Sequence, residues 1–147
     1  MNHKLRQIDF MSIDWFQSVG LRYELLRKPL GLEFTLQELF GEKQEIVFGV
    51  FKGDLLVSTA NCILSEKCVK IRQVATRYDF QRHGIGMFLI NGIEAYFFNN
   101  GIVRIEMNAR KSSLDFYNKI GYSTTGNEFF EVGIPHLKIY KTFYPNK

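Results

Sequence analysis

The sequence of 147 residues is poor in cysteine and has no long apolar segment. Its two cysteines, Cys62 and Cys68, are too few for a metal site. Even if a hairpin brings them close, we expect them to be reduced and buried thiols. No apolar run reaches the ~18–20 residues that span a bilayer, so we expect no membrane partner. The N-terminus carries charges through its middle, unlike a signal peptide, and this predicts a cytoplasmic protein.

Charge of one sign is also scarce. The 19 Lys and Arg residues slightly outnumber the 15 Asp and Glu residues, which gives a net charge of +4, and no run of basic residues occurs. A protein that binds nucleic acid usually concentrates its basic residues on one face, so the composition argues against a nucleic-acid partner. A modest positive charge suits an anionic cofactor.

The residues that are abundant indicate a well-packed globular protein. Apolar residues make up 46% of the sequence and aromatic residues 15%, with 14 Phe. The length fits one domain of ordinary size, and no internal repeat or linker divides the chain. We therefore predict a single domain over residues 1–147, in which only 145–147 suggest disorder.

Periodicity and turn residues predict alternating strands and helices. The expected strands are 3–10, 45–52, 55–64, 68–76, 102–107, 122–131 and 136–144. The expected helices run from Ser12 or Asp14 to 27 with Trp15 and Phe16 on one apolar face, over 35–40, from the glycines near 84 to 99, and from 112 or 113 to 120. Strands 68–76 and 102–107 flank a helix and should be parallel. The last strand is a candidate sheet edge, so a monomer and a homodimer are both open.

The segment from 73 to 89 reads as a strand end, a turn containing two glycines and a helix start. The first turn of a helix leaves backbone N–H groups without partners, and these groups bind anions well. Gly84 and Gly86 let the backbone approach a phosphate closely, and Arg82 adds a positive charge. The dinucleotide and P-loop patterns are both absent from this segment. Alternatively, the glycines serve only the packing of the helix start.

The spacing Gln81-x-x-Gly84-x-Gly86 resembles the Q/R-x-x-G-x-G/A pyrophosphate loop of the GNAT superfamily of N-acetyltransferases. Further segments look like motifs of that superfamily in the expected order. They are the two strand ends 73–76 and 107–110, the FYNKIGY segment 116–122 and the GIPH segment 133–136, which is typical of one branch. Segment 25–31 also resembles small members. The chain is identified as a member on these motifs, although Gln81 stands where arginine is frequent.

The resemblance implies a fold and a co-substrate. The implied fold is a single mixed, mostly antiparallel sheet flanked by helices, of class α/β (α+β), in the order β-α-α-β-β-β-α-β-α-β-β. The implied co-substrate is acetyl-CoA, whose pantetheine arm takes the place of a missing strand where two parallel strands separate. The residues expected to hold it are Val74, Ala75, Thr76, Gln81, Arg82, His83, Gly84, Ile85, Gly86, Met87, Asn108, Ser113 and Phe116. For Val74 and Thr76, the alternative is ordinary strand pairing.

Transfer of an acetyl group needs a neutral amine and a proton donor for the departing thiolate. By resemblance Tyr117 is the general acid; the alternative is a core aromatic on a short helix. The general base is left open between a water chain and four side chains. These candidates are Glu106, Glu128, Glu131 and His136, the last of which could instead bond its loop backbone.

The acceptor site is expected between the first two helices and the last hairpin. Its candidate residues are Glu24, Arg27, Glu131 and His136, and for the first two the alternative is a solvated helix face. We predict direct acetyl transfer to a primary amine, on a small molecule or a peptide, in a ternary complex and without a metal. The alternatives are a non-catalytic acyl-CoA-binding sensor or regulatory module and an acyltransferase for longer chains.

Overall fold

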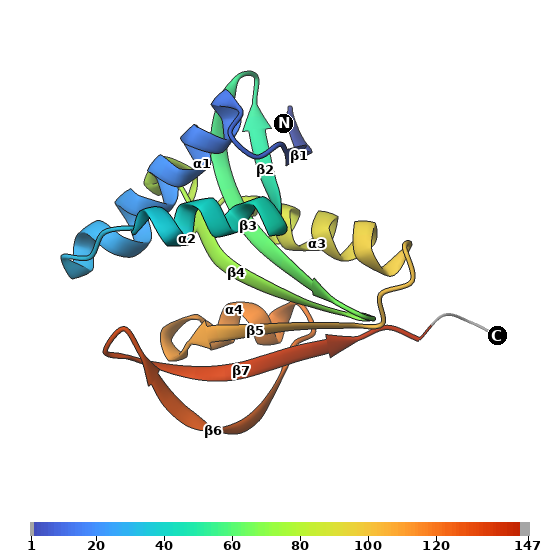
Figure 1. The fold of residues 1–147 in the computed structure, drawn as a ribbon. Helices are drawn as coiled ribbons and strands as arrows, with labels where there is room; N and C mark the ends of the chain where they lie inside the picture. Colours follow the sequence, from blue (N-terminus) through green and yellow to red (C-terminus); the bar gives the residue numbers. More distant parts are fainter. Residues whose placement is uncertain (1, 145–147) are drawn as a thin grey trace.

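The computed structural model describes residues 2–144, so the disorder expected for 145–147 lies outside the described residues. A seven-stranded mixed sheet runs through the molecule in the order β1-β2-β3-β4-β5-β7-β6 (Figure 1). The strands are β1 His3–Ile8, β2 Ile46–Lys52, β3 Leu55–Ser65, β4 Cys68–Thr76, β5 Arg104–Arg110, β6 Ser123–Glu131 and β7 Ile134–Thr142. The α-helices are α1 Ile13–Arg22, α2 Leu36–Gly41, α3 Ile85–Phe98 and α4 Leu114–Lys119.

The order of elements confirms the predicted fold class. Strands β1 to β4 pair as antiparallel neighbours, β4 and β5 are parallel across α3, and β7 is antiparallel to both β5 and β6. The last strand is therefore not an edge, because it lies between β5 and β6; the edges are β1 and β6. Chain order alone suggested an edge, but the final hairpin folds so that its second strand pairs with β5.

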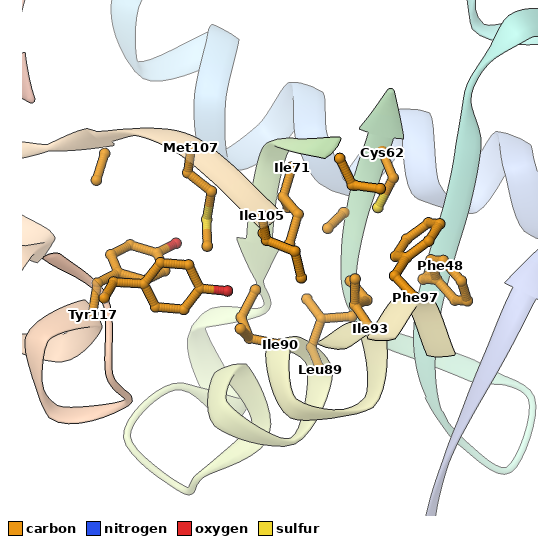
Figure 2. Close-up of a cluster of buried hydrophobic side chains, with 14 of the residues drawn as sticks. Phe48, Cys62, Ile71, Leu89, Ile90, Ile93, Phe97, Ile105, Met107 and Tyr117 are labelled. Carbon is orange, nitrogen blue, oxygen red and sulfur yellow. The ribbon is translucent and has the colours of Figure 1, made fainter. Parts of the chain in front are cut away.

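Helices cover the two faces of the sheet through separate apolar clusters. Successive residues of a strand point to opposite faces. In β2, Phe48 and Val50 contact the cluster that contains α3, whereas Val47 joins the cluster that contains Trp15 and Leu21 of α1. Figure 2 shows the first cluster, with Phe48 at one end and Tyr117 at the other. In residues 2–144 no helix is long and apolar enough to cross a membrane.

The first helical segment ends at Arg27 as predicted, but it differs from the prediction in the geometry of its last turn and in its buried face. The α-helix ends at Arg22 and continues as a π-helical turn, Tyr23–Arg27, before Gly31 reverses the chain at φ 69°. Trp15 is 3% exposed, but Phe16, predicted on the same face, is 55% exposed. The buried face includes the polar residues Ser18 and Arg22, which apolar periodicity cannot reveal.

The cysteines are free thiols, as expected, but Cys68 is only partly buried and they do not face each other. Cys62 pairs in register with Ile71, and Cys68 with Ser65. Burial raises the pKa of the Cys62 thiol far above its usual range, so this side chain is a small core residue.

Candidate active site between strands β4 and β5

The two parallel strands separate part-way along their length. They pair only from Cys68 with Arg104 to Ile71 with Met107, and then diverge toward their C-terminal ends (Figure 1). The β3–β4 register shifts by one residue between Thr59 and Asn61, which places a bulge in β4 at Gln73 and Val74. Gln73 has φ 54°, a left-handed conformation that is uncommon for a residue with a side chain. The bulge bends β4 away from β5 and opens the sheet.

A cleft of about 710 Å³ occupies this opening. It brings together most of the residues that the sequence singled out. The predicted cofactor residues that line it are Val74, Ala75, Thr76, Gln81, Asn108 and Ser113, and the predicted catalytic and acceptor residues that line it are Tyr117, Arg27, Glu131 and His136. The backbone of β4 beyond Ile71 has no ladder partner on the β5 side.

The turn after β4 lies next to this cleft and contains the other predicted phosphate ligands, Arg82, His83, Gly84, Ile85, Gly86 and Met87, which do not line it. Gly84 precedes α3 with φ 79°, which favours glycine, and no side chain caps the helix. The N–H groups of the first helical turn are therefore available to an anion. Gln81 Nε2 donates to the carbonyl of Thr76 at 2.9 Å, so its side chain fixes the turn to the strand end.

The ring of Phe116, on α4, lies beside Gly86 in the first turn of α3. A Cβ at Gly86 would lie 3.5 Å from Phe116 Cζ and 4.0 Å from Thr76 Oγ1. Glycine thus keeps a narrow gap open between the phosphate turn, the end of β4 and α4. The partly exposed ring of Phe116 forms one wall of this gap.

Tyr117 lies on α4 at the floor of the cleft. Its side chain is 8% exposed and packs by its ring edge against Phe116 and Tyr122. Burial raises the pKa of the Tyr117 hydroxyl to about 12. Among the described residues, no hydrogen-bond partner occupies this hydroxyl, whereas the Tyr122 hydroxyl donates to Glu94 Oε2 at 2.8 Å. The Tyr117 hydroxyl is therefore protonated at neutral pH and can donate its proton.

Three polar side chains of the cleft lining lie next to one another. Asn108 Nδ2 donates to Glu131 Oε1 at 3.4 Å, and Glu131 Oε2 lies 3.6 Å from His136 Nε2. His136 is buried, and its Nδ1 lies 2.7 Å from the carbonyl oxygen of Ile134. A carbonyl only accepts, so Nδ1 carries the hydrogen and Nε2 faces the carboxylate. His136 thus makes the backbone bond of the structural alternative and also lines the cleft.

The two other candidate bases and Glu24 do not line this cleft. Glu106 accepts from Arg104 Nε at 2.8 Å, and this hydrogen bond is the main cause of its lowered pKa. Glu128 is exposed and pairs with Lys111 at 3.1 Å. Glu24 lies in a separate hollow of about 550 Å³ and pairs with Lys28 at 3.5 Å.

A buried ion pair behind the bulge was missed by the sequence reading. Arg22 is fully buried and donates to both carboxylate oxygens of Glu42, at 2.7 and 2.8 Å. Trp15 Nε1 donates to the same carboxylate, at 3.0 Å. The one signal in the sequence is the i, i+4 pair Ser18 and Arg22, in which Arg22 Nε donates to Ser18 Oγ. Within residues 2–144, no three His, Cys, Asp or Glu side chains lie together as metal ligands would.

The sequence profile of the Acetyltransferase (GNAT) domain family matches residues 32–143, well over half of the chain. The chain belongs to the GNAT acetyltransferase family. This GNAT chain is 26% identical over 112 residues to the uncharacterized protein YyaT of Bacillus subtilis (strain 168), a match that covers 76% of this chain and 72% of YyaT.

Solved structures share the fold of this GNAT acetyltransferase at low sequence identity. PaiA N-acetyltransferase from Thermoplasma acidophilum, in complex with coenzyme A, has a TM-score of 0.78 and 12% identity over 97% of this chain and 100% of its own. An aminoglycoside 6'-N-acetyltransferase complexed with coenzyme A has a TM-score of 0.81 and 15% identity over 98% and 99%. The family and the fold predicted from the motifs are confirmed, and so is the enzyme class, an acyltransferase.

Proposed function

We propose that this GNAT protein transfers the acetyl group of acetyl-CoA to a primary amine by direct attack within a ternary complex. The observation that carries the proposal is a cleft lined by unpaired β4 backbone, with an uncapped helix N-terminus next to it. An amide-rich, phosphorylated ligand satisfies both features at once. The coenzyme A in the solved structures of PaiA and of the aminoglycoside acetyltransferase supports this choice.

The residues of the cleft divide into a cofactor side and an acceptor side. The backbones of Val74 and Thr76 would pair with the pantetheine amides, and the N–H groups from Arg82 to Met87 would hold the pyrophosphate. Asn108 and Ser113 would flank the thioester. Acetyl-CoA supplies the activated acyl group, and side chains of the protein bind the reactants and transfer the protons.

The proposed reaction moves one acyl group and two protons. The amine nitrogen attacks the thioester carbon, a C–N bond forms and the C–S bond breaks. Tyr117 gives its proton to the departing sulfur, which otherwise leaves as a thiolate of pKa ~8.5. The Glu131–His136 pair takes the proton that the amine nitrogen loses, because both side chains line the same cleft as Tyr117.

The experiment that tests this function is release of free CoA thiol from acetyl-CoA with a panel of small amines and peptides, followed by the mass of the acetylated product. The proposal expects thiol release that depends on the amine and matches the product formed. Tight acetyl-CoA binding without release for any amine would instead favour the non-catalytic sensor or regulatory module. Longer acyl-CoA thioesters in the same assay test the third possibility.

The assembly and location of the protein stay predictions. We propose a cytoplasmic enzyme, monomeric or homodimeric, that requires no metal and binds neither nucleic acid nor membrane. The exposed edges β1 and β6 are the strands available for pairing between copies.

A further inference from the structure

The charged side chains around the cleft are mostly of one sign. Its lining contains four cationic side chains and a single carboxylate. The cationic side chains are Arg27, Lys70, Arg72 and Arg110, and the carboxylate is that of Glu131. A concave site lined by one sign of charge raises the local concentration of ligands of the opposite sign.

Two of these cations form ion pairs with carboxylates and, among the described residues, two form none, although the charge of Lys70 also acts on the carboxylate of Glu106, its register partner. Arg27 pairs with Glu38 at 2.7 Å, and Arg72 with Glu45 at 3.7 Å. Among residues 2–144, neither Lys70 nor Arg110 has a carboxylate within 4.0 Å, and Arg110 is half-buried. A half-buried guanidinium has lost part of its hydration. An anionic partner would therefore stabilise it more than the same partner would stabilise a fully exposed guanidinium.

The cofactor phosphates do not account for these charges. Lys70 is the register partner of Glu106, and Arg110 that of His136, so all four side chains lie on one face of the sheet. The alternate residues Ile105, Met107 and Ala109 point to the other face and join the cluster of α3. The phosphate turn begins α3 on that other face. Lys70 and Arg110 therefore face the acceptor side, together with His136.

We propose that the acceptor amine carries a carboxylate, and that the Arg110 guanidinium binds it. The inference rests on the proposed acetyl transfer and narrows its substrate class. Arginine binds a carboxylate through two parallel N–H donors, which fixes the orientation of the acceptor. Because His136 lies directly opposite Arg110 in register, the amine of such an acceptor reaches the Glu131–His136 pair. The site thus holds both ends of an amino acid-like molecule.

The test compares acceptors that differ only in the carboxylate. Acetylation of β-alanine and 4-aminobutyrate is measured beside propylamine and butylamine, whose amino groups have similar basicity. The proposal expects kcat/KM to be roughly 10- to 100-fold higher for the carboxylate-bearing member of a pair, as for hydrogen bonds to charged groups. Equal or better turnover of the alkylamines overturns the proposal and leaves acetyl transfer standing. Absence of turnover with every amine overturns both.

Variants of Arg110 assign the preference to the site. Arg110→Gln should lower kcat/KM for 4-aminobutyrate by ~10-fold or more and change butylamine turnover less than ~2-fold, while Arg110→Lys retains part of the preference. Lys4→Gln is the matched control, since Lys4 is exposed on the far edge strand β1. An equal loss for both amines in Arg110→Gln overturns the assignment. The comparison of acceptors with the unmodified protein decides the substrate class even where a variant does not fold.

Discussion

The buried Arg22 side chain donates from Nη1 to the side-chain oxygen of Gln73 at 3.2 Å. Gln73 is the bulge residue with φ 54°, and Arg22 is itself fixed by two hydrogen bonds to Glu42. The conformation that separates β4 from β5 is therefore supported by a charged pair that joins α1 to the segment after α2. The opening of the cleft depends on how the N-terminal helices pack against β4.

Replacement of Arg22 by methionine should destabilise the protein strongly. Glu42 is 2% exposed, and removal of its partner leaves a buried charge unpaired, which typically costs ~3–5 kcal/mol. Urea unfolding measures this loss. Addition of Glu42→Leu to Arg22→Met should recover much of it, because no charge then remains buried.

The control for Arg22 is the partly exposed pair of Arg27 and Glu38, whose side chains are 20% and 40% exposed. Arg27→Met should cost no more than ~1 kcal/mol, as surface ion pairs do. Similar losses of unfolding free energy for Arg22→Met and Arg27→Met would contradict the claim that the buried pair of Arg22 and Glu42 is needed for stability.

The sequence predicted features that depend on neighbouring residues better than features that depend on tertiary contacts. Gly84 marks the turn because its left-handed backbone conformation favours glycine, and the local motif was therefore readable from the sequence. Trp15 and Phe16 are neighbours of similar hydrophobicity, yet one is buried and the other exposed. The buried polar face of α1 decided between them, and nothing in apolar periodicity reports it.

The cleft itself was predicted only in outline. The motifs placed the separation of the two strands near their ends, at 73–76 and 107–110, and the structure shows that their pairing already stops after Ile71 and Met107. The positive side chain of Arg110 went unnoticed because its orientation depends on the β5–β7 register. The place of β7 inside the sheet was missed for the same reason, since pairing between strands distant in sequence is a tertiary property.

Replacement of Gly86 by alanine should separate stability from cofactor binding. Alanine is a better helix former than glycine, and the added Cβ makes only ordinary contacts in the free protein, so stability should stay equal or rise by up to ~1 kcal/mol. The same Cβ narrows the gap beside Phe116, so acetyl-CoA affinity should fall ~10-fold or more on calorimetric titration. Gly41→Ala is the control, because its Cβ meets nothing within 4 Å. Unchanged affinity in Gly86→Ala would place the cofactor elsewhere.

The kcat/KM of the enzyme should rise with pH and should not fall again within the usual assay range. The acceptor amine must lose a proton, so kcat/KM rises with pH, while Tyr117 stays protonated because burial raises its pKa to about 12. A proton donor with an ordinary tyrosine pKa would lose activity from about pH 10. A pH–rate profile up to pH ~10.5 measures the difference. A fall with a midpoint below pH ~10 that disappears in Tyr117→Phe would contradict the assigned protonation state.

Replacement of Glu131 by glutamine should impair the acceptor half of the reaction. We expect kcat/KM for the amine to fall ~10- to 100-fold and acetyl-CoA affinity to stay within ~2-fold, because the carboxylate lies near His136 and not at the phosphate turn. Glu128→Gln is a matched control, since that carboxylate is exposed and bound to Lys111. Equal effects of the two substitutions would argue against a role for Glu131 in proton transfer.

The most direct test of acetyl transfer in this cleft is the single-turnover rate of Tyr117→Phe with acetyl-CoA and an accepted amine. If Tyr117 donates the proton to the departing sulfur, the rate should fall at least ~100-fold while calorimetry finds acetyl-CoA affinity within ~2-fold of the wild type. Tyr122→Phe, whose hydroxyl is bound to Glu94, should retain the wild-type rate within ~3-fold once folded. A Tyr117→Phe rate within ~3-fold of the wild type would contradict the account.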